Sequence, residues 1–162
     1  MTPTRSSPLE MQCDGLEITS RRGVVFLTGH PEIISPEKLK MRCDQLAYRQ
    51  LRSRMGRWIS RPAMPDEKQK YHGWDRSEHR GKYVNCFVFK FQNSKNSLRL
   101  YGFLCNPDIE NPRFQMFVPV RLETKRTDDA DVTILNQVVA ISRDAAIVAC
   151  TNTFKSPPVR KG

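Results

Sequence analysis

The chain has 162 residues, of which 38% are apolar and 27% charged, and its net charge is +10 at pH 7. That length fits one domain with an ordinary core, and the composition excludes a chain too polar to fold. No apolar run is long enough to span a bilayer, so we expect no membrane partner. The charge favours an acidic partner such as nucleic acid or an acidic protein.

The sequence lacks several common catalytic and metal-binding signatures. It has no Gly-rich phosphate loop, no G-x-S-x-G and no H-E-x-x-H, which disfavours nucleotide hydrolysis and serine hydrolase chemistry. Its cysteines are widely spaced, which predicts reduced thiols and neither a zinc site nor a disulfide framework. They are Cys13, Cys43, Cys86, Cys105 and Cys150. The first ten residues contain no apolar signal core, so we expect a cytoplasmic protein.

The first third of the chain predicts a strand followed by a helix. We expect residues 1–15 to be a flexible N-terminus, 16–154 a single domain and 155–162 a basic flexible tail. Val24–Leu27 predicts a strand, either alone or in a hairpin with Leu16–Thr19. Ser35 is a good N-cap and Pro36 suits the first position of a helix.

Apolar residues continue at helical spacing as far as Trp58, which predicts one long helix with a possible break at Gly56. Its opposite face is basic and would be either a solvated surface or a contact for RNA phosphates. The residues on that face are Lys38, Arg42, Arg49 and Arg52. Residues 60–80 form a polar connection in which His72 and His79 are either surface residues or a general acid or base.

The centre of the chain predicts three antiparallel strands joined by short loops. The apolar runs Tyr83–Phe91, Leu98–Leu104 and Phe114–Leu122 are separated by turn residues. Asp131 then precedes an apolar helix, and the alanine-rich run before Cys150 favours a second helix. The expected fold is therefore α+β: a small antiparallel sheet, made of this meander and an N-terminal strand, packed against a long basic helix and one or two C-terminal helices.

Basic residues collect along the three central strands. Alternation of side chains along a strand would bring several of them to one face, where they could bind one phosphate without a metal. These residues are Lys90, Arg99, Arg121, Lys125 and Arg126. Tyr83 and Tyr101 could stack on bases. The alternative is a solvated sheet face, although cations without acidic partners repel one another and so favour a bound anion.

A second pattern is that of a magnesium-dependent nuclease. Asp108 and Glu123 would hold Mg²⁺, and Lys125 would lie beside the attacked phosphate. The Asn-Pro-Asp turn explains Asp108 equally well without a metal.

The order of these elements, and the segments Leu98–Leu104, Phe114–Val120 and Glu123–Thr127, resemble the RelE/HigB toxins of bacterial toxin–antitoxin pairs. The resemblance implies an mRNA interferase that acts on ribosome-bound mRNA by 2′-hydroxyl attack, without a metal or cofactor, and that is neutralised by an acidic antitoxin. It implies that Arg99 and Lys125 stabilise the transition state.

The resemblance further implies that Lys90 and Arg126 contact phosphates and that Tyr101 stacks or packs. The chain departs from the family in its length, and Phe154 stands near where a catalytic tyrosine or histidine would be. The alternative is a module of the same fold that binds nucleic acid or protein without cleaving.

Overall fold

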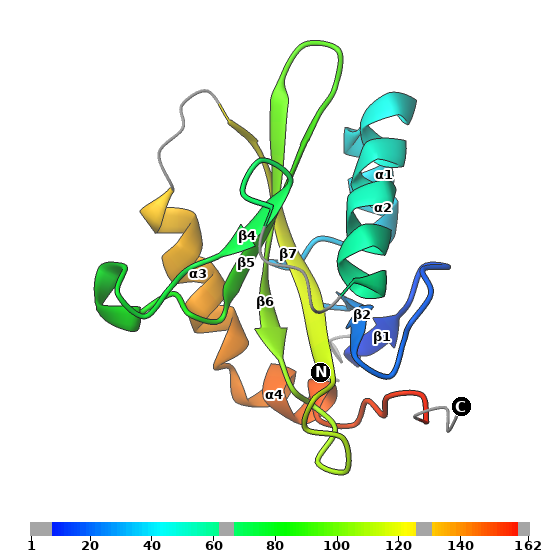
Figure 1. Ribbon diagram of the computed structural model, residues 1–162, viewed down its shortest axis with the longest axis vertical. Coiled ribbons are helices and arrows are strands. Elements are labelled where there is room, and N and C mark those ends of the chain that lie inside the picture. The colour runs from blue at the N-terminus through cyan, green and yellow to red at the C-terminus, as the bar shows by residue number, and fades with distance from the viewer. Residues whose placement is uncertain (1–7, 62–66, 126–130, 159–162) are drawn as a thin grey trace, which may run out of the picture.

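The computed structural model describes residues 8–61, 67–125 and 131–158. A mixed sheet lies at its centre, with helices on both faces (Figure 1). The strands are β1 (Glu10–Gln12), β2 (Arg22–Val24), β3 (Phe26–Thr28), β4 (Tyr71–Gly73), β5 (Cys86–Gln92), β6 (Ser97–Cys105) and β7 (Gln115–Lys125). The helices are α1 (Pro36–Arg42), α2 (Gln45–Ser60), α3 (Val132–Ser142) and α4 (Ala145–Thr151), with a 3-10 turn at His79–Gly81.

The predicted meander is present, but the sheet around it is larger than expected. Its five strands are ordered β2-β7-β6-β5-β4, and β1 and β3 form a second, two-stranded sheet. β2 runs parallel to β7, whereas the remaining pairs are antiparallel. The expectation of a small, purely antiparallel sheet is therefore wrong.

The N-terminal segment explains part of this difference. Val24–Leu27 is extended as predicted, but it changes sheets at Val25, so that β2 pairs with β7 and β3 pairs with β1. Leu16–Thr19 is not a strand, and the antiparallel partner of β3 is instead Glu10–Gln12, within the segment expected to be flexible.

Each face of the sheet carries its own apolar core, because the central strands are apolar on both sides. One core packs Phe87, Phe89 and Leu100 against α2, and Trp58 lies at its centre. The other packs residues such as Val88 and Phe103 against α3 and α4. Strands buried on both faces give continuous apolar runs instead of alternation, as these three segments do.

The expected single helix between residues 36 and 58 is wrong, because the chain forms two helices. Cys43 has extended backbone angles (φ −105°, ψ 138°), and the next residue, Asp44, caps α2 by accepting a hydrogen bond from the Ala47 N–H (2.7 Å). Gly56, where a break was considered, lies inside α2. The break also leaves Leu46, expected in the core, 65% exposed.

The C-terminal helices agree with the sequence prediction. Asp131 caps α3 and Asp144 caps α4, each accepting hydrogen bonds from N–H groups of the first turn. Among the described residues, no single helix is long and apolar enough to cross a membrane; α3 and α4 pass that test only as a pair, which is bent by 68°. The pair packs on the sheet, with Leu135, Val138 and Ile147 fully buried.

Candidate nucleic-acid interface

A β-bulge decides which side chains of β7 lie beside those of β6. The register passes from Gly102 opposite Pro119 to Tyr101 opposite Arg121, so Val120 is the extra residue on β7. One extra residue reverses which side chains face each side of a sheet. Phe117 and Leu122 are five residues apart, and in a regular strand their side chains would point to opposite faces. Because of the bulge, both lie in the same core.

The bulge brings most of the predicted cations to one face. Lys90 lies opposite Arg99, Arg99 lies opposite Glu123, and Ser97 lies opposite Lys125. Residues directly opposite each other project to the same side, as do residues two apart on one strand. We call the set formed by Lys90, Arg99, Arg121 and Lys125 the cationic face. It shares its side of the sheet with α3.

Within the cationic face, the partners of Arg121 are known. The Arg121 guanidinium donates to the Glu123 carboxylate and to the Gln137 side-chain oxygen on α3. Glu123 is therefore bound by Arg121 on its own strand and also lies opposite Arg99 on β6. Arg126 lies outside the described residues, so its expected phosphate contact has no structural description.

A pocket adjoins the cationic face at the edge of β5. β4 covers this edge only at Phe87–Phe89, and the segment before β4 continues along it, since the Lys90 N–H donates to the Lys70 carbonyl oxygen (2.7 Å). On the other side, the Arg54 guanidinium reaches from α2 to the Lys90 carbonyl oxygen. The Lys90 ammonium donates to the Lys68 carbonyl oxygen (2.8 Å). Strand β5, helix α2 and the segment before β4 thus meet at Lys90.

Five basic residues line this pocket, and the described residues that line it include no acidic one. We call it the basic pocket; its volume is about 510 Å³. The lining cations are Arg54, Lys68, Lys70, Lys90 and Arg99, and the polar residues are Gln50, Gln69, Gln92 and Ser97. The amide and hydroxyl groups add uncharged hydrogen-bond donors. This composition suits a polyanion such as a phosphodiester chain.

Two groups modify the charge of the basic pocket. Partial burial lowers the pKa of the Arg54 guanidinium. The neighbouring Glu67 carboxylate is occupied by Arg57 at 2.6 Å and lies 3.7 Å from the Lys70 ammonium. The hydrogen bond from Arg57 holds the pKa of Glu67 below its usual value, so this carboxylate stays ionised.

Tyr101 lies in the core between these cations and α3. Its side chain is 1% exposed, so the structure favours packing over stacking on a base. Its hydroxyl is buried without a hydrogen-bond partner that meets normal geometry among the described residues. Burial raises the pKa of Tyr101, and the nearby Arg99 guanidinium opposes that rise. Tyr83 is likewise buried, and its hydroxyl donates to Asn136 (2.7 Å).

The four cations expected along one long helix do not form a single surface. The break at Cys43 separates Lys38 and Arg42, on α1, from Arg49 and Arg52, on α2. The Arg42 guanidinium donates to the Leu122 carbonyl oxygen (2.9 Å), and Arg49 is exposed.

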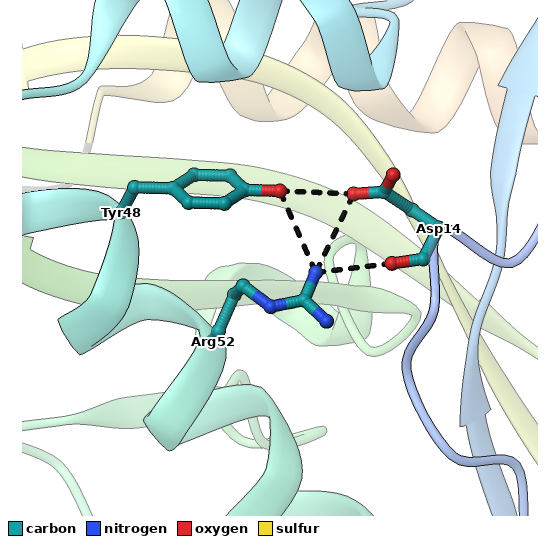
Figure 2. Close-up of polar contacts among 3 residues, drawn as sticks. All are labelled: Asp14, Tyr48 and Arg52. Atoms are coloured by element: carbon teal, nitrogen blue, oxygen red, sulfur yellow. Dashed lines mark hydrogen bonds and ion pairs between the residues drawn. The ribbon is translucent and has the colours of Figure 1, made fainter. Parts of the chain in front are cut away.

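Arg52 holds the N-terminal segment against α2 (Figure 2). Its guanidinium donates to the Asp14 carbonyl oxygen (3.0 Å) and lies 3.5 Å from the Asp14 carboxylate, which also accepts from the Tyr48 hydroxyl (3.0 Å). Asp14 has a positive φ of 50°, a conformation that aspartate tolerates better than most residues. A structural role therefore accounts for Arg52 without RNA.

The two carboxylates expected to hold magnesium lie at opposite ends of the sheet. Glu123 faces Arg99 near the β5–β6 turn, whereas Asp108 follows the far end of β6. Asp108 is 5% exposed and accepts from the backbone N–H and the hydroxyl of Ser156, at 3.0 and 2.9 Å. No cluster of three potential metal ligands occurs in the described parts of the chain. The geometry thus disfavours a magnesium-dependent nuclease.

The two histidines of the polar connection do not line the basic pocket. His72 lies on β4 with its Nδ1 atom 2.9 Å from the Gly73 carbonyl oxygen, and the His79 ring packs against Tyr83. The described lining of the pocket therefore lacks a histidine that would serve as general acid or base.

Sequence reasoning missed three of the five pocket cations. Arg54 was not among the basic residues expected on the helix face, and Lys68 and Lys70 were treated as part of a polar connection. The only local signal was Tyr71, whose aromatic ring packs on Phe87 and Phe89 and so holds the short strand β4 against β5.

The chain matches no protein-family model, no curated protein and no solved structure.

Proposed function

We propose that this protein binds RNA through the phosphate backbone, using the basic pocket and the adjoining cationic face. The observation that carries the proposal is the convergence of five cations from α2, from the segment before β4 and from the central strands on one pocket without a described acidic lining residue. Several lysines and arginines around one groove are the usual way in which a protein follows a nucleic-acid backbone.

The proposal extends to a RelE/HigB-like toxin that cleaves mRNA on the ribosome in the cytoplasm and is neutralised by an acidic antitoxin. In this reaction the 2′-hydroxyl gives up its proton as its oxygen bonds to the adjacent phosphorus, the bond from phosphorus to the 5′-oxygen breaks, and the 5′-oxygen takes up one proton, so the proton balance is zero. Arg99 and Lys125, which share one face of adjacent strands, would stabilise the extra negative charge.

Binding without cleavage is the second candidate, and it too has a specific observation in its favour. The described residues that line the basic pocket include no histidine, cysteine or carboxylate, and Tyr101 on the adjoining face is buried. A general acid for the leaving oxygen is therefore missing from the described lining. A phosphate-binding site of this kind would still bind RNA tightly.

Binding is tested with purified protein and a labelled single-stranded RNA at several salt concentrations. We expect the affinity to fall steeply with salt, and Arg99→Gln to weaken binding at least about tenfold, since a charged hydrogen bond is worth roughly 1.5–3 kcal/mol. Arg113→Gln is the matched control, because Arg113 is exposed in the loop at the other end of β6 and β7. Equal weakening by both substitutions would refute the assignment of this site.

Cleavage is tested on free RNA in EDTA, and on ribosome-bound mRNA in the magnesium that ribosomes require. The toxin hypothesis predicts fragments that end in a 2′,3′-cyclic phosphate, and no cut where the attacking 2′-hydroxyl is replaced by hydrogen. Retained binding with intact RNA under both conditions would leave the binding module as the function. Cleavage of free RNA only after addition of Mg²⁺ would overturn the metal-free mechanism.

A further inference from the structure

A second hollow lies on the far side of the sheet from the basic pocket, along the edge of β7. β2 covers that edge only at Gln115–Phe117, although β7 continues to Lys125. Beyond β2, the hollow is bounded by residues 31–34, by α1 and by α3. We call it the β7 hollow. Its volume of about 500 Å³ lies within the range of roughly 300–1,000 Å³ that is typical of small-molecule sites.

Two carbonyl groups on the open edge of β7, beside the hollow, are hydrogen-bonded although no strand covers them. The Ile34 N–H donates to the Val120 carbonyl oxygen (2.8 Å), and the Arg42 guanidinium donates to the Leu122 carbonyl oxygen (2.9 Å). Since these two bonds already occupy the edge carbonyls, a further strand would have to break them. The hollow therefore suits a small ligand better than an added strand.

The walls of the β7 hollow are apolar and its rim is cationic. Ile34, Leu122 and Val138 are among the apolar residues that line it. Lys38 and Arg42 line it from α1 and Arg121 from β7, against a single described acidic lining residue, Glu32.

Arg42 is the cation best placed to receive an anion. Of the five N–H donors of a guanidinium, the described residues use one, for the Leu122 carbonyl oxygen. That bond fixes the group beside β7 and leaves donors for a carboxylate, which binds arginine in a bidentate geometry. Lys38, one helical turn earlier on α1, is exposed beside it.

We propose that the β7 hollow binds a small amphipathic carboxylate, with its carboxylate on Arg42 and Lys38 and its apolar body between α1 and α3. The cations of the rim would bind the carboxylate, and the apolar walls would contact the hydrocarbon part. This site is separate from the basic pocket, and the proposal does not depend on RNA binding.

The test titrates the full-length protein with octanoate, below its micelle concentration, by calorimetry and by NMR. Octanoate is expected to bind one-to-one and to shift the amide signals of Ile34, Gln137 and Ala140. Octanol lacks the charge and acetate lacks the apolar body, so each should bind at least about tenfold more weakly. Octanol binding as tightly as octanoate, or shifts confined to other parts of the protein, would overturn the proposal.

Two substitutions separate the apolar and the charged contributions. Ala140 lines the hollow from an exposed position on α3, so Ala140→Phe fills the space without changing the core. Arg42→Gln removes the charge, and Arg49→Gln, an exposed arginine outside the lining, is its control. Ala140→Phe and Arg42→Gln should each weaken octanoate binding at least about tenfold, and the control should not. Unchanged binding to a folded Ala140→Phe protein would place the ligand elsewhere and refute the site.

Discussion

Lys90 on β5 and Arg99 on β6 lie directly opposite each other, so two cations project from one cross-strand position. Like charges in this arrangement repel and reduce the stability of the sheet. Glu123 faces Arg99 from the other side but is itself bound by Arg121. An anion bound in the basic pocket, which Lys90 and Arg99 both line, would offset this repulsion.

The first prediction is that inorganic phosphate stabilises the protein more than chloride at the same ionic strength. At ten times its dissociation constant, a ligand that binds only the folded state contributes about 1.4 kcal/mol. For a chain of this length that corresponds to a rise in Tm of roughly 3–6 °C, measured by thermal unfolding. Arg99→Gln should abolish the difference between the two salts, whereas Arg113→Gln should retain it. Equal effects of both salts on the unchanged protein would contradict the prediction.

The second prediction concerns Trp58, the centre of the core beneath α2. Its ring contacts Phe87, Phe89 and Phe117, and the Arg22 guanidinium lies 4.6 Å from the ring centroid. Trp58→Ala should lower the free energy of unfolding by about 3–5 kcal/mol, because it removes a large buried side chain and leaves a cavity. Urea denaturation measures this change.

Leu46→Ala provides the control for Trp58. Leu46 is also an apolar residue of α2 but is 65% exposed, so its loss should change the free energy of unfolding by less than about 0.5 kcal/mol. A large effect at Leu46 would mean that its side chain is buried in solution, contrary to its exposure in the structure.

A third prediction compares two glycines with opposite requirements. A Cβ at Gly102 would lie 2.2 Å from the Val118 carbonyl oxygen and 2.5 Å from the Phe117 ring, because the strands approach closely beside the bulge. Gly102→Ala should therefore shift the bulge or prevent folding, with a loss of more than about 3 kcal/mol.

Gly56, in contrast, lies inside α2 with no atom within 4 Å of its added Cβ. Gly56→Ala should stabilise the protein by about 0.5–1 kcal/mol, since alanine has the higher helix propensity. Both variants are measured by thermal and urea unfolding. A neutral Gly102→Ala substitution would show that β6 and β7 are further apart than the structure places them.

The fourth prediction is a pH dependence due to Asp108. The hydrogen bonds from Ser156 lower the pKa of its carboxyl below the usual value of 3.8. A carboxyl with a lower pKa in the folded state stabilises the protein above its unfolded pKa, and this stabilisation disappears as the pH falls through the folded pKa. The Tm should therefore fall in acid, and Asp108→Asn should flatten that part of the profile below about pH 4.

The control for this profile is Asp75→Asn. Asp75 is exposed, whereas both hydrogen bonds from Ser156 go to Asp108. It should leave the acid limb of the Tm profile in place. An unchanged acid limb in Asp108→Asn would show that other carboxylates account for the loss of stability.

The sequence was informative wherever a signal is local. The three central strands and the two C-terminal helices could be predicted from apolar runs, turn residues and the capping carboxylates of Asp131 and Asp144. The break between α1 and α2 was missed because apolar spacing continues through Cys43, although Asp44 has the chemistry of an N-cap. Periodicity alone does not reveal such a break.

The parts that could not be predicted depend on contacts between distant segments. The bulge at Val120 has no sequence mark of its own, yet it determines that Arg121 and Lys125 share a face with Arg99. The basic pocket likewise exists only because three-residue β4 pairs with β5 and brings Lys68 beside Lys90. A strand of that length is too short for an alternating pattern to identify it.

The parallel pairing of β2 with β7 has a consequence for the synthesis of the chain. Val24 meets its partner Phe117 only after about 90 further residues have been made. Phe26 and Leu27 can pair early with β1, but until β7 is made Val24 and Val25, both buried in the finished protein, have no strand to pair with. A nascent chain that stalls before β7 would expose this edge to other chains, so aggregation competes with folding over most of the time needed for translation.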